Sequence, residues 1–206
     1  MLTRRYKAIS VVFLTVILAG WLVYQFGPFQ AVFAVSNLSD PTKLATLGER
    51  AANPRLNKIV HWLHEADRKG MSPEITIRIA QLINRTKEPR ASLVKESLIR
   101  NVKIADLLGL FVPENEVRLR NGKAGVITRG RYAASHMEID HIVPYSLAPE
   151  AGNELANLEM MPQHLNREKS NRVGRRQLAH AEKLYAAGLI TRESLAKTKN
   201  KAISIK

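Results

Sequence analysis

The chain has 206 residues, which suits one compact domain of ordinary size plus an additional segment. Hydrophobic residues make up 45% and charged residues 24%, a composition that excludes a disordered chain. The formal net charge of +14 predicts an anionic partner, either nucleic acid or an acidic membrane surface. The absence of cysteine excludes disulfides, a thiol nucleophile and every cysteine-based metal site.

The N-terminal segment, residues 1–35, is expected to anchor or to export the chain. Residues 9–26 are almost wholly apolar, and this length of helix roughly matches the ~30 Å hydrocarbon core of a bilayer. Arg4, Arg5 and Lys7 precede the run, and the positive-inside rule keeps them in the cytoplasm. The rest of the chain is therefore expected outside the cytoplasm, at the periplasmic or extracellular face.

Two interpretations of this segment compete. The apolar run is long for a signal peptide, which favours an uncleaved transmembrane anchor. The alternative is a signal peptide with a small-x-small cleavage site at Val32-Phe33-Ala34, which predicts secretion after cleavage near Ala34. A buried core helix is disfavoured because no polar face interrupts the run.

The middle region, residues 36–115, is predicted to be helical and carries no specific functional signal. Apolar residues recur at helical spacing over 53–70, and further helices are expected over about 72–84 and 91–108. His61 and His64 lie three residues apart on the first of these helices and could form a metal pair. We favour ordinary surface or half-buried histidines, because no third ligand stands at a suitable spacing.

The C-terminal region, residues 116–206, has a different pattern. Short strands are expected over 124–128 and 137–142, with a further short extended run over 157–161. A basic helix is expected over 163–176, with a bend or break near Gly174. The predicted order in this region is strand, loop, strand and helix, followed by closing helical structure around 185–195.

Two segments of this region resemble the HNH, or ββα-metal, nuclease family. Residues 138–144 read EIDHIVP and resemble the first strand of that family, and residues 157–169 read NLEMMPQHLNREK and resemble its second strand and helix. The resemblance covers about residues 118–176 and depends on the ordered set of motifs within one compact stretch, because a lone Asp-His pair has no diagnostic value.

The resemblance implies a metal-dependent nuclease site. It implies that Asp140 and Asn166 bind one divalent metal ion, either Mg²⁺ or, as alternatives, Mn²⁺ or another divalent ion. His141 would act as the general base on water, and Asn157 would hold the loop and the histidine in place. His164 is an alternative ligand to Asn166, and Glu138 is expected to share the face of Asp140, because residues two apart on a strand point the same way.

The chain departs from the family pattern in one respect. Many HNH modules carry two Cys-x-x-Cys pairs that bind a structural zinc, whereas Pro162 and Leu165 stand where one of those pairs would fall. We therefore expect no structural zinc. Apolar packing must stabilise the module instead, by Leu158, Met160, Met161 and Leu165.

The predicted helix and the residues after it are basic. Residues 161–206 contain eleven Lys or Arg residues against three Glu residues, a net charge of +8. Lys169, Arg172, Arg175 and Arg176 are predicted to contact nucleic-acid phosphates, and residues 197–206 could be either a phosphate track or a solvated basic tail.

The sequence therefore predicts an α+β chain with an N-terminal membrane-anchor or signal helix, a helical middle region and a C-terminal ββα-metal module. The predicted function is an endonuclease that hydrolyses phosphodiester bonds of nucleic acid, with DNA favoured over RNA as the partner. A non-catalytic nucleic-acid-binding module that retains the ββα fold is the alternative. A third hypothesis is a basic membrane-surface protein whose middle helices are the active part.

Overall fold

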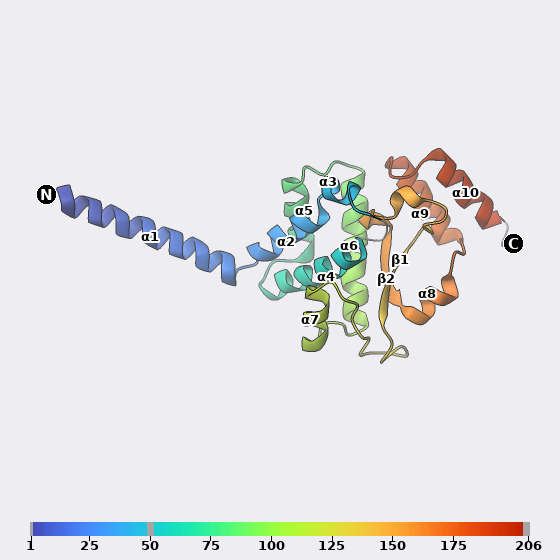
Figure 1. The fold of residues 1–206 in the computed structure, drawn as a ribbon, viewed down its shortest axis with the longest axis horizontal. Helices are drawn as coiled ribbons and strands as arrows, with labels where there is room; N and C mark the ends of the chain where they lie inside the picture. The colour runs from blue at the N-terminus through green and yellow to red at the C-terminus, as the bar shows by residue number, and fades with distance from the viewer. Residues whose placement is uncertain (1, 49–51, 204–206) are drawn as a thin grey trace.

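The computed structural model describes residues 2–48 and 52–203. A long helix, α1 (Leu2–Phe26), projects away from a helix-rich body (Figure 1). Twelve large apolar side chains between Ile9 and Tyr24 are 38–66% exposed on this helix. Among the described residues no single helix is both long and apolar enough to cross a membrane, whereas Ile9–Gln25 and Phe29–Ala45 satisfy that test together as a pair bent by 63°.

The bend lies at Gly27 and Pro28, between α1 and α2 (Phe29–Ser39). The N–H of Gly27 still donates to the carbonyl of Val23 at 2.8 Å, but a Cβ atom on Gly27 would lie only 2.3 Å from that oxygen. Pro28 has no N–H to continue the α1 hydrogen-bond ladder, and it forms the N-cap of α2. The Gly-Pro pair therefore ends α1, whose apolar side chains are exposed, and is followed by α2, whose apolar side chains are partly buried.

Helix α2 packs within the body, with Val32 and Val35 buried against α4 and α5. The domain boundary that we expected at residue 35 therefore falls inside a helix whose apolar face belongs to the core. The helices of the body after α2 are α3 (Pro41–Ala45), α4 (Ala52–Arg68), α5 (Pro73–Ile83), α6 (Arg90–Leu107) and α7 (Pro113–Arg120).

The three helices predicted in the middle region are confirmed as α4, α5 and α6, with ends within two residues of the expected ones. Ser72 accepts a hydrogen bond from the N–H of Ile75 at 3.4 Å, and Pro73 occupies the first position of α5. Helix α7 was not predicted, because it is only eight residues long and its apolar content is low, although Pro113 and two glutamates in its first turn are typical of a helix start. The core of the body is formed by fully buried side chains that include Leu56, Ile59 and Leu63.

The C-terminal region contains a two-stranded antiparallel sheet, β1 (Met137–His141) and β2 (Leu158–Pro162), followed by α8 (Gln163–Lys169). The register pairs Asp140 with Glu159 and His141 with Leu158. Two short 3₁₀ turns lie in the connection between the strands, η1 (Pro149–Ala151) and η2 (Leu155–Asn157). The order strand, loop, strand and helix agrees with the predicted order.

The strand predicted over 124–128 is wrong. Within this segment only Val126 forms an isolated bridge, to His136. The backbone of Val126 is instead bonded by a side chain, because Asn115 of α7 accepts from its N–H at 2.8 Å and donates to its carbonyl at 2.7 Å. A side chain from the preceding helix thus bonds one edge of the segment at Val126, while Gly125 and Ile127 form backbone hydrogen bonds with residues 134–137 on the other edge.

The basic helix predicted over 163–176 is two helices. Helix α8 ends at Lys169, and Ser170 adopts a positive φ of 49°, which the α-helix does not allow. Helix α9 (Arg175–Ala186) starts after Gly174, whose N–H donates to the side chain of Gln177 at 3.0 Å. The closing helical structure that we placed around 185–195 is the end of α9, a turn, and α10 (Arg192–Ile203).

Helix α6 supports the free edge of the small sheet. Asn101 of α6 accepts a hydrogen bond from the N–H of Met160 at 2.7 Å and donates to the carbonyl of Leu158 at 3.0 Å. Ser97 donates to the carbonyls of Leu155 and Leu158 at 2.8 and 3.1 Å. The architecture is therefore a helix-rich α+β fold in which the helical body covers an otherwise unpaired strand edge.

Candidate functional site

The site predicted from the sequence lies where β1 meets α8. Glu138 and Asp140 are two residues apart on β1 and both contact α8, as expected for residues that share one face of a strand. The strand ends at His141, directly after Asp140. This termination was expected, because the two neighbouring side chains must leave the alternating pattern of a strand in order to serve one site.

Helix α8 presents a stripe of three polar residues to β1. Gln163 and Asn166 donate to the two carboxylate oxygens of Glu138, each at 2.8 Å. Lys169 forms an ion pair with Asp140 and donates to the carbonyl of His141 at 2.7 Å. Since residues three apart lie on the same side of a helix, the stripe aligns α8 with the end of β1.

His141 is buried, with 7% of its surface exposed, and its Nε2 atom lies 3.0 Å from the carbonyl oxygen of Gly152. A carbonyl oxygen only accepts hydrogen bonds, so Nε2 carries the proton in the neutral ring and Nδ1 carries the lone pair. The ring of Tyr145 lies 5.8 Å from the imidazole, centroid to centroid. The loop between the strands thus fixes both the tautomer and the orientation of the histidine.

Asn157 stabilises the same loop. Its side-chain oxygen accepts from the N–H of Val143 at 2.9 Å, and its Nδ2 atom donates to the carbonyls of Val143 and Ala151 at 3.0 and 3.4 Å. The side chain is fully buried. These contacts connect Asn157 to the loop between the strands, which is the kind of contact that the implied holding role requires.

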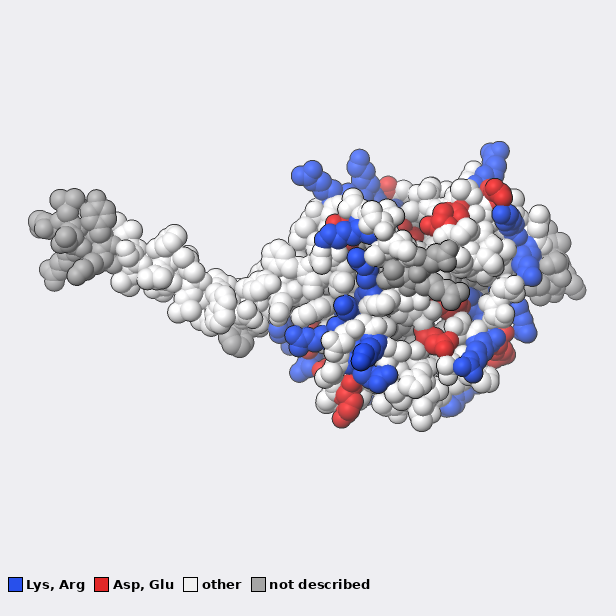
Figure 2. Space-filling model, viewed as in Figure 1, with Lys and Arg blue, Asp and Glu red and all other residues white. Residues whose placement is uncertain are grey.

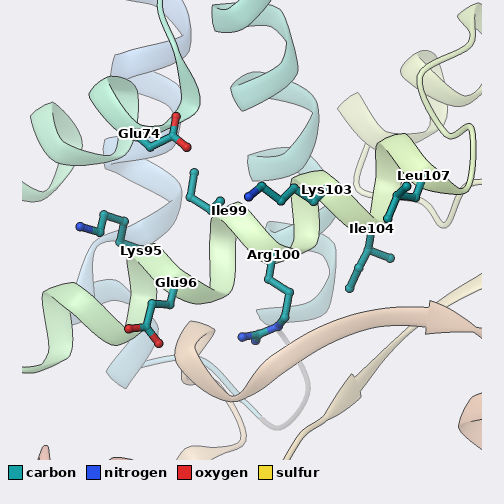
Figure 3. A pocket seen from close by; sticks show the side chains of 8 residues that line it. All are labelled: Glu74, Lys95, Glu96, Ile99, Arg100, Lys103, Ile104 and Leu107. Carbon is teal, nitrogen blue, oxygen red and sulfur yellow. The ribbon is translucent and has the colours of Figure 1, made fainter.

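A second ionic cluster, which the sequence did not reveal, lies beside the site. Glu159, paired across the strands with Asp140, forms ion pairs with Arg100 of α6, at 3.0 Å, and with Arg176 of α9. Burial lowers the pKa of Arg100, while the neighbouring Glu159 carboxylate acts in the opposite direction. Arg100 extends from α6 toward the neighbouring strand, at the border of a cavity of about 560 Å³ (Figure 3). No local motif joins residues this far apart in the sequence.

The expected metal ligands offer only oxygen donors, which suits a hard divalent cation such as Mg²⁺. Lys169 contacts the Oδ2 atom of Asp140. The other carboxylate oxygen, Oδ1, accepts no hydrogen bond from the described residues. Asn166 uses its Nδ2 atom toward Glu138, and its Oδ1 atom likewise accepts none within the described part of the chain. Those residues contain no group of three or more His, Cys, Asp or Glu side chains that could hold a metal ion. The expected pair, one carboxylate and one amide, is a smaller set than such a group.

The alternative ligand His164 points away from this face. Its side chain is 75% exposed, and its nearest ionic partner is Glu168, at 4.0 Å on the next turn of α8. Asn166, by contrast, contacts β1 through Glu138. The geometry therefore favours Asn166 over His164 as the second donor.

The residues predicted to contact phosphate occupy different environments. Lys169 lies within the site, and Arg176 pairs with Glu159, whereas Arg172 and Arg175 are exposed. In the far tail, Lys197 pairs with Glu193 and Lys199 with Glu182. Lys and Arg side chains are spread over the face of the body shown in Figure 2, with acidic side chains between them.

His61 and His64 are separate from the β1–α8 site. The imidazole of His64 stacks on the ring of Phe111 at 3.8 Å, and its Nε2 atom lies 3.4 Å from Glu116. Burial lowers the pKa of both histidines, and the nearby Glu116 carboxylate acts in the opposite direction. Their side chains do not form a metal group with any third residue of the described chain.

Comparisons of the chain with protein-family models, with curated proteins and with solved structures found no match.

Proposed function

We propose that this chain is a metal-dependent endonuclease of the HNH type, which hydrolyses phosphodiester bonds of nucleic acid, with DNA rather than RNA as its substrate. The observation that carries the proposal is the meeting of Glu138 and Asp140 on β1 with Asn166 and Lys169 on α8, beside a histidine of fixed tautomer. The motifs that resemble the family and the ββα arrangement of the elements support each other.

His141 is suited to the role of general base. Its Nε2 proton is directed to Gly152, so the lone pair on Nδ1 can accept a proton from an attacking water. Asn157 limits movement of the loop that carries Gly152, and so keeps the imidazole in one orientation. The proton moves from water to Nδ1 while the water oxygen attacks phosphorus. The bond from phosphorus to the leaving sugar oxygen breaks, and that oxygen takes a proton from solvent water.

Asp140 and Asn166 are proposed to be the residues that would hold the divalent cation, through side-chain oxygens. When bound there, the cation supplies positive charge that stabilises the phosphate and the leaving oxygen. Lys169 neutralises Asp140 through the Oδ2 atom and brings an ammonium group to the place where the anionic substrate binds. Glu138 orients Asn166 by accepting its Nδ2 proton.

A membrane location is also proposed, with α1 as an uncleaved anchor and the β1–β2–α8 region outside the cytoplasm. The packing of α2 supports retention of the anchor. Cleavage near Ala34 would cut α2 between the buried side chains Val32 and Val35. The elements of the site lie on the side of the body away from α1, where a large substrate can approach (Figure 1).

The test uses the full chain in detergent with plasmid DNA. We expect cleavage with Mg²⁺ or Mn²⁺, no cleavage in the presence of a chelator, and loss of cleavage in Asp140→Ala. His164→Ala is the matched control, because it removes an exposed polar side chain from the same region. If the parent binds DNA in a salt-sensitive manner but never cuts it, the non-catalytic binding module is the correct description.

A further inference from the structure

A cavity of about 370 Å³, lined by both polar and apolar side chains, lies between elements near the end of the body from which α1 projects; these elements can be followed in Figure 1. Residues of α2, α4 and α7 border this cavity, and none of them belongs to the β1–α8 site. Its polar lining residues are Gln30, His61, Glu65, Glu116 and Arg120.

The position of this cavity along the chain places it close to the end of the exposed apolar helix. Gln30 is the fourth residue after Phe26, where α1 ends, and the 63° bend between α1 and α2 keeps its rise along the α1 axis within the roughly 6 Å that four residues of straight helix would add. The headgroup layer of a bilayer extends about 5–7 Å beyond the hydrocarbon core on each side. With α1 as the membrane anchor of the proposed function, the cavity lies at the depth of the lipid headgroups.

The cavity has two acidic and two basic side chains around it, and one of the basic side chains, Arg120, is not paired with either carboxylate. Glu65 and Glu116 are both about one-fifth exposed and share one cation, Arg68, at 3.2 and 3.3 Å. The guanidinium of Arg120 lies elsewhere on the lining, over the ring of Trp62 at 5.9 Å. Two carboxylates against two guanidinium groups make the local net charge zero, which suits a zwitterion better than an anion.

His61, whose ring packs edge-on against Trp62, adds one buried atom that has no hydrogen-bond partner among the described residues. Only 6% of its surface is exposed, and its Nδ1 atom has no hydrogen-bond partner among the described residues. A buried polar atom of this kind costs free energy unless a ligand or water satisfies it. The lining therefore offers two carboxylates, a guanidinium and an unsatisfied imidazole nitrogen.

We propose that this cavity binds the headgroup of a zwitterionic phospholipid with a primary ammonium, that is, a phosphoethanolamine headgroup. The ammonium donates hydrogen bonds to Glu65 and Glu116, and the phosphate receives them from Arg120. A quaternary ammonium fits less well, because it donates no hydrogen bond and because the ring of Trp62 is already covered by Arg120. The inference rests on the proposed membrane anchor and adds a lipid that fixes the body against the bilayer.

The first test measures binding of soluble glycerophosphoethanolamine to the full chain in detergent. The chain has two tryptophans, so Trp21→Phe leaves Trp62, at the cavity, as the only tryptophan, which is excited selectively at roughly 295 nm, beyond tyrosine absorption. We expect a saturable change in emission, weakened roughly tenfold by Glu65→Gln and by Arg120→Gln, the loss of one charge-assisted contact. Arg131→Gln is the matched control, since Arg131 also lies over an aromatic ring, that of Tyr132, at 4.7 Å.

No saturable change, equal binding by Arg120→Gln, or an equal response to inorganic phosphate would each overturn the assignment. A second arm identifies the source of the ligand. Full-length protein extracted from mixed vesicles of phosphatidylethanolamine and phosphatidylcholine should retain the first lipid in excess, as measured by mass spectrometry. Binding of the soluble compound without that excess would overturn the lipid headgroup in favour of a free metabolite.

These measurements are independent of catalysis. Arg120→Gln should cut plasmid DNA at the parental rate in detergent, and Asp140→Ala should bind glycerophosphoethanolamine like the parent. Failure of the nuclease proposal would leave both binding arms unchanged. Failure of the headgroup proposal would leave plasmid cleavage unchanged.

Discussion

The helical body, α2 to α7, and the β1–β2–α8 region differ in the interactions that hold their elements in place. The body is held by apolar side chains such as Leu56, Ile59 and Leu63, each fully buried. The β1–β2–α8 region also buries apolar side chains such as Leu158 and Met160, but single polar side chains bond its backbone. Asn157, before β2, and Asn101, which reaches β2 from α6, each satisfy several backbone groups at once. Apolar packing is non-directional, whereas these hydrogen bonds fix positions. Substitutions in the body should therefore reduce stability, and substitutions around β1 and β2 should reduce activity.

The largest effect is expected from His141→Ala. Removal of the general base should lower the rate of plasmid cleavage by about 10²–10⁴-fold, while the free energy of unfolding changes far less. Single-turnover cleavage at saturating Mg²⁺ measures the rate, and His164→Ala should stay near the parental value. Parental activity in His141→Ala would refute the proposed mechanism.

Leu63→Ala tests how much apolar packing in the helical body contributes to stability. The side chain is fully buried in α4, so its truncation should cost about 2–5 kcal/mol of unfolding free energy. The cleavage rate per folded molecule should remain parental, because the residue lies outside the β1–α8 site. Urea unfolding of the full chain in detergent measures the first quantity. Exposed Leu107, on α6, provides the control, and Leu107→Ala should cost about 0.5 kcal/mol or less.

The same difference explains what the sequence could predict. Helical periodicity and caps located α4, α5 and α6 to within two residues, because those signals are local. The motif around Asp140 and His141 located β1 for the same reason. The strand expected over 124–128 does not form, and Asn115, on a helix that the pattern did not reveal, bonds the backbone of Val126 within it. Local sequence carries no signal for such a contact.

The site shows the same limit. Asp140, Asn166 and Glu138 could be named from the motif, but the partners of Glu159 could not. Arg100 lies on α6, far away in the sequence, and reaches Glu159 only through the packing of the helical body on β2.

Asn101 lies at the contact between the helical body and β2. Asn101→Ala should therefore lower both the free energy of unfolding and the cleavage rate. The variant loses the bonds to Leu158 and Met160 and leaves buried backbone groups of β2 without partners, at a cost of about 1–3 kcal/mol. A decrease in cleavage rate per folded molecule should accompany this loss, since β2 leads into α8. Asn121→Ala removes an exposed amide bonded only to Val117 and should change neither measurement. Loss of stability with a parental rate would show that β2 keeps its position without Asn101.

The smallest expected effect is the pH dependence of stability that His180, on α9, contributes. Burial lowers the pKa of His180 to about 4, with Arg100 contributing in the same direction, while its Nε2 atom lies 3.0 Å from the carbonyl of Ala156. Because the unfolded chain binds a proton near pH 6.5 and the folded chain does not, the unfolded state binds more protons between these values. Stability should therefore fall as pH drops from about 6.5 toward 4, by about 1–2 kcal/mol after allowance for solvent screening. His180→Gln keeps a donor for Ala156 but does not titrate, so its unfolding free energy should lose this part of the pH dependence. An unchanged pH profile would place the acid sensitivity in other groups, and the contact between α9 and the loop before β2 would then be as tolerant of charge as an exposed surface.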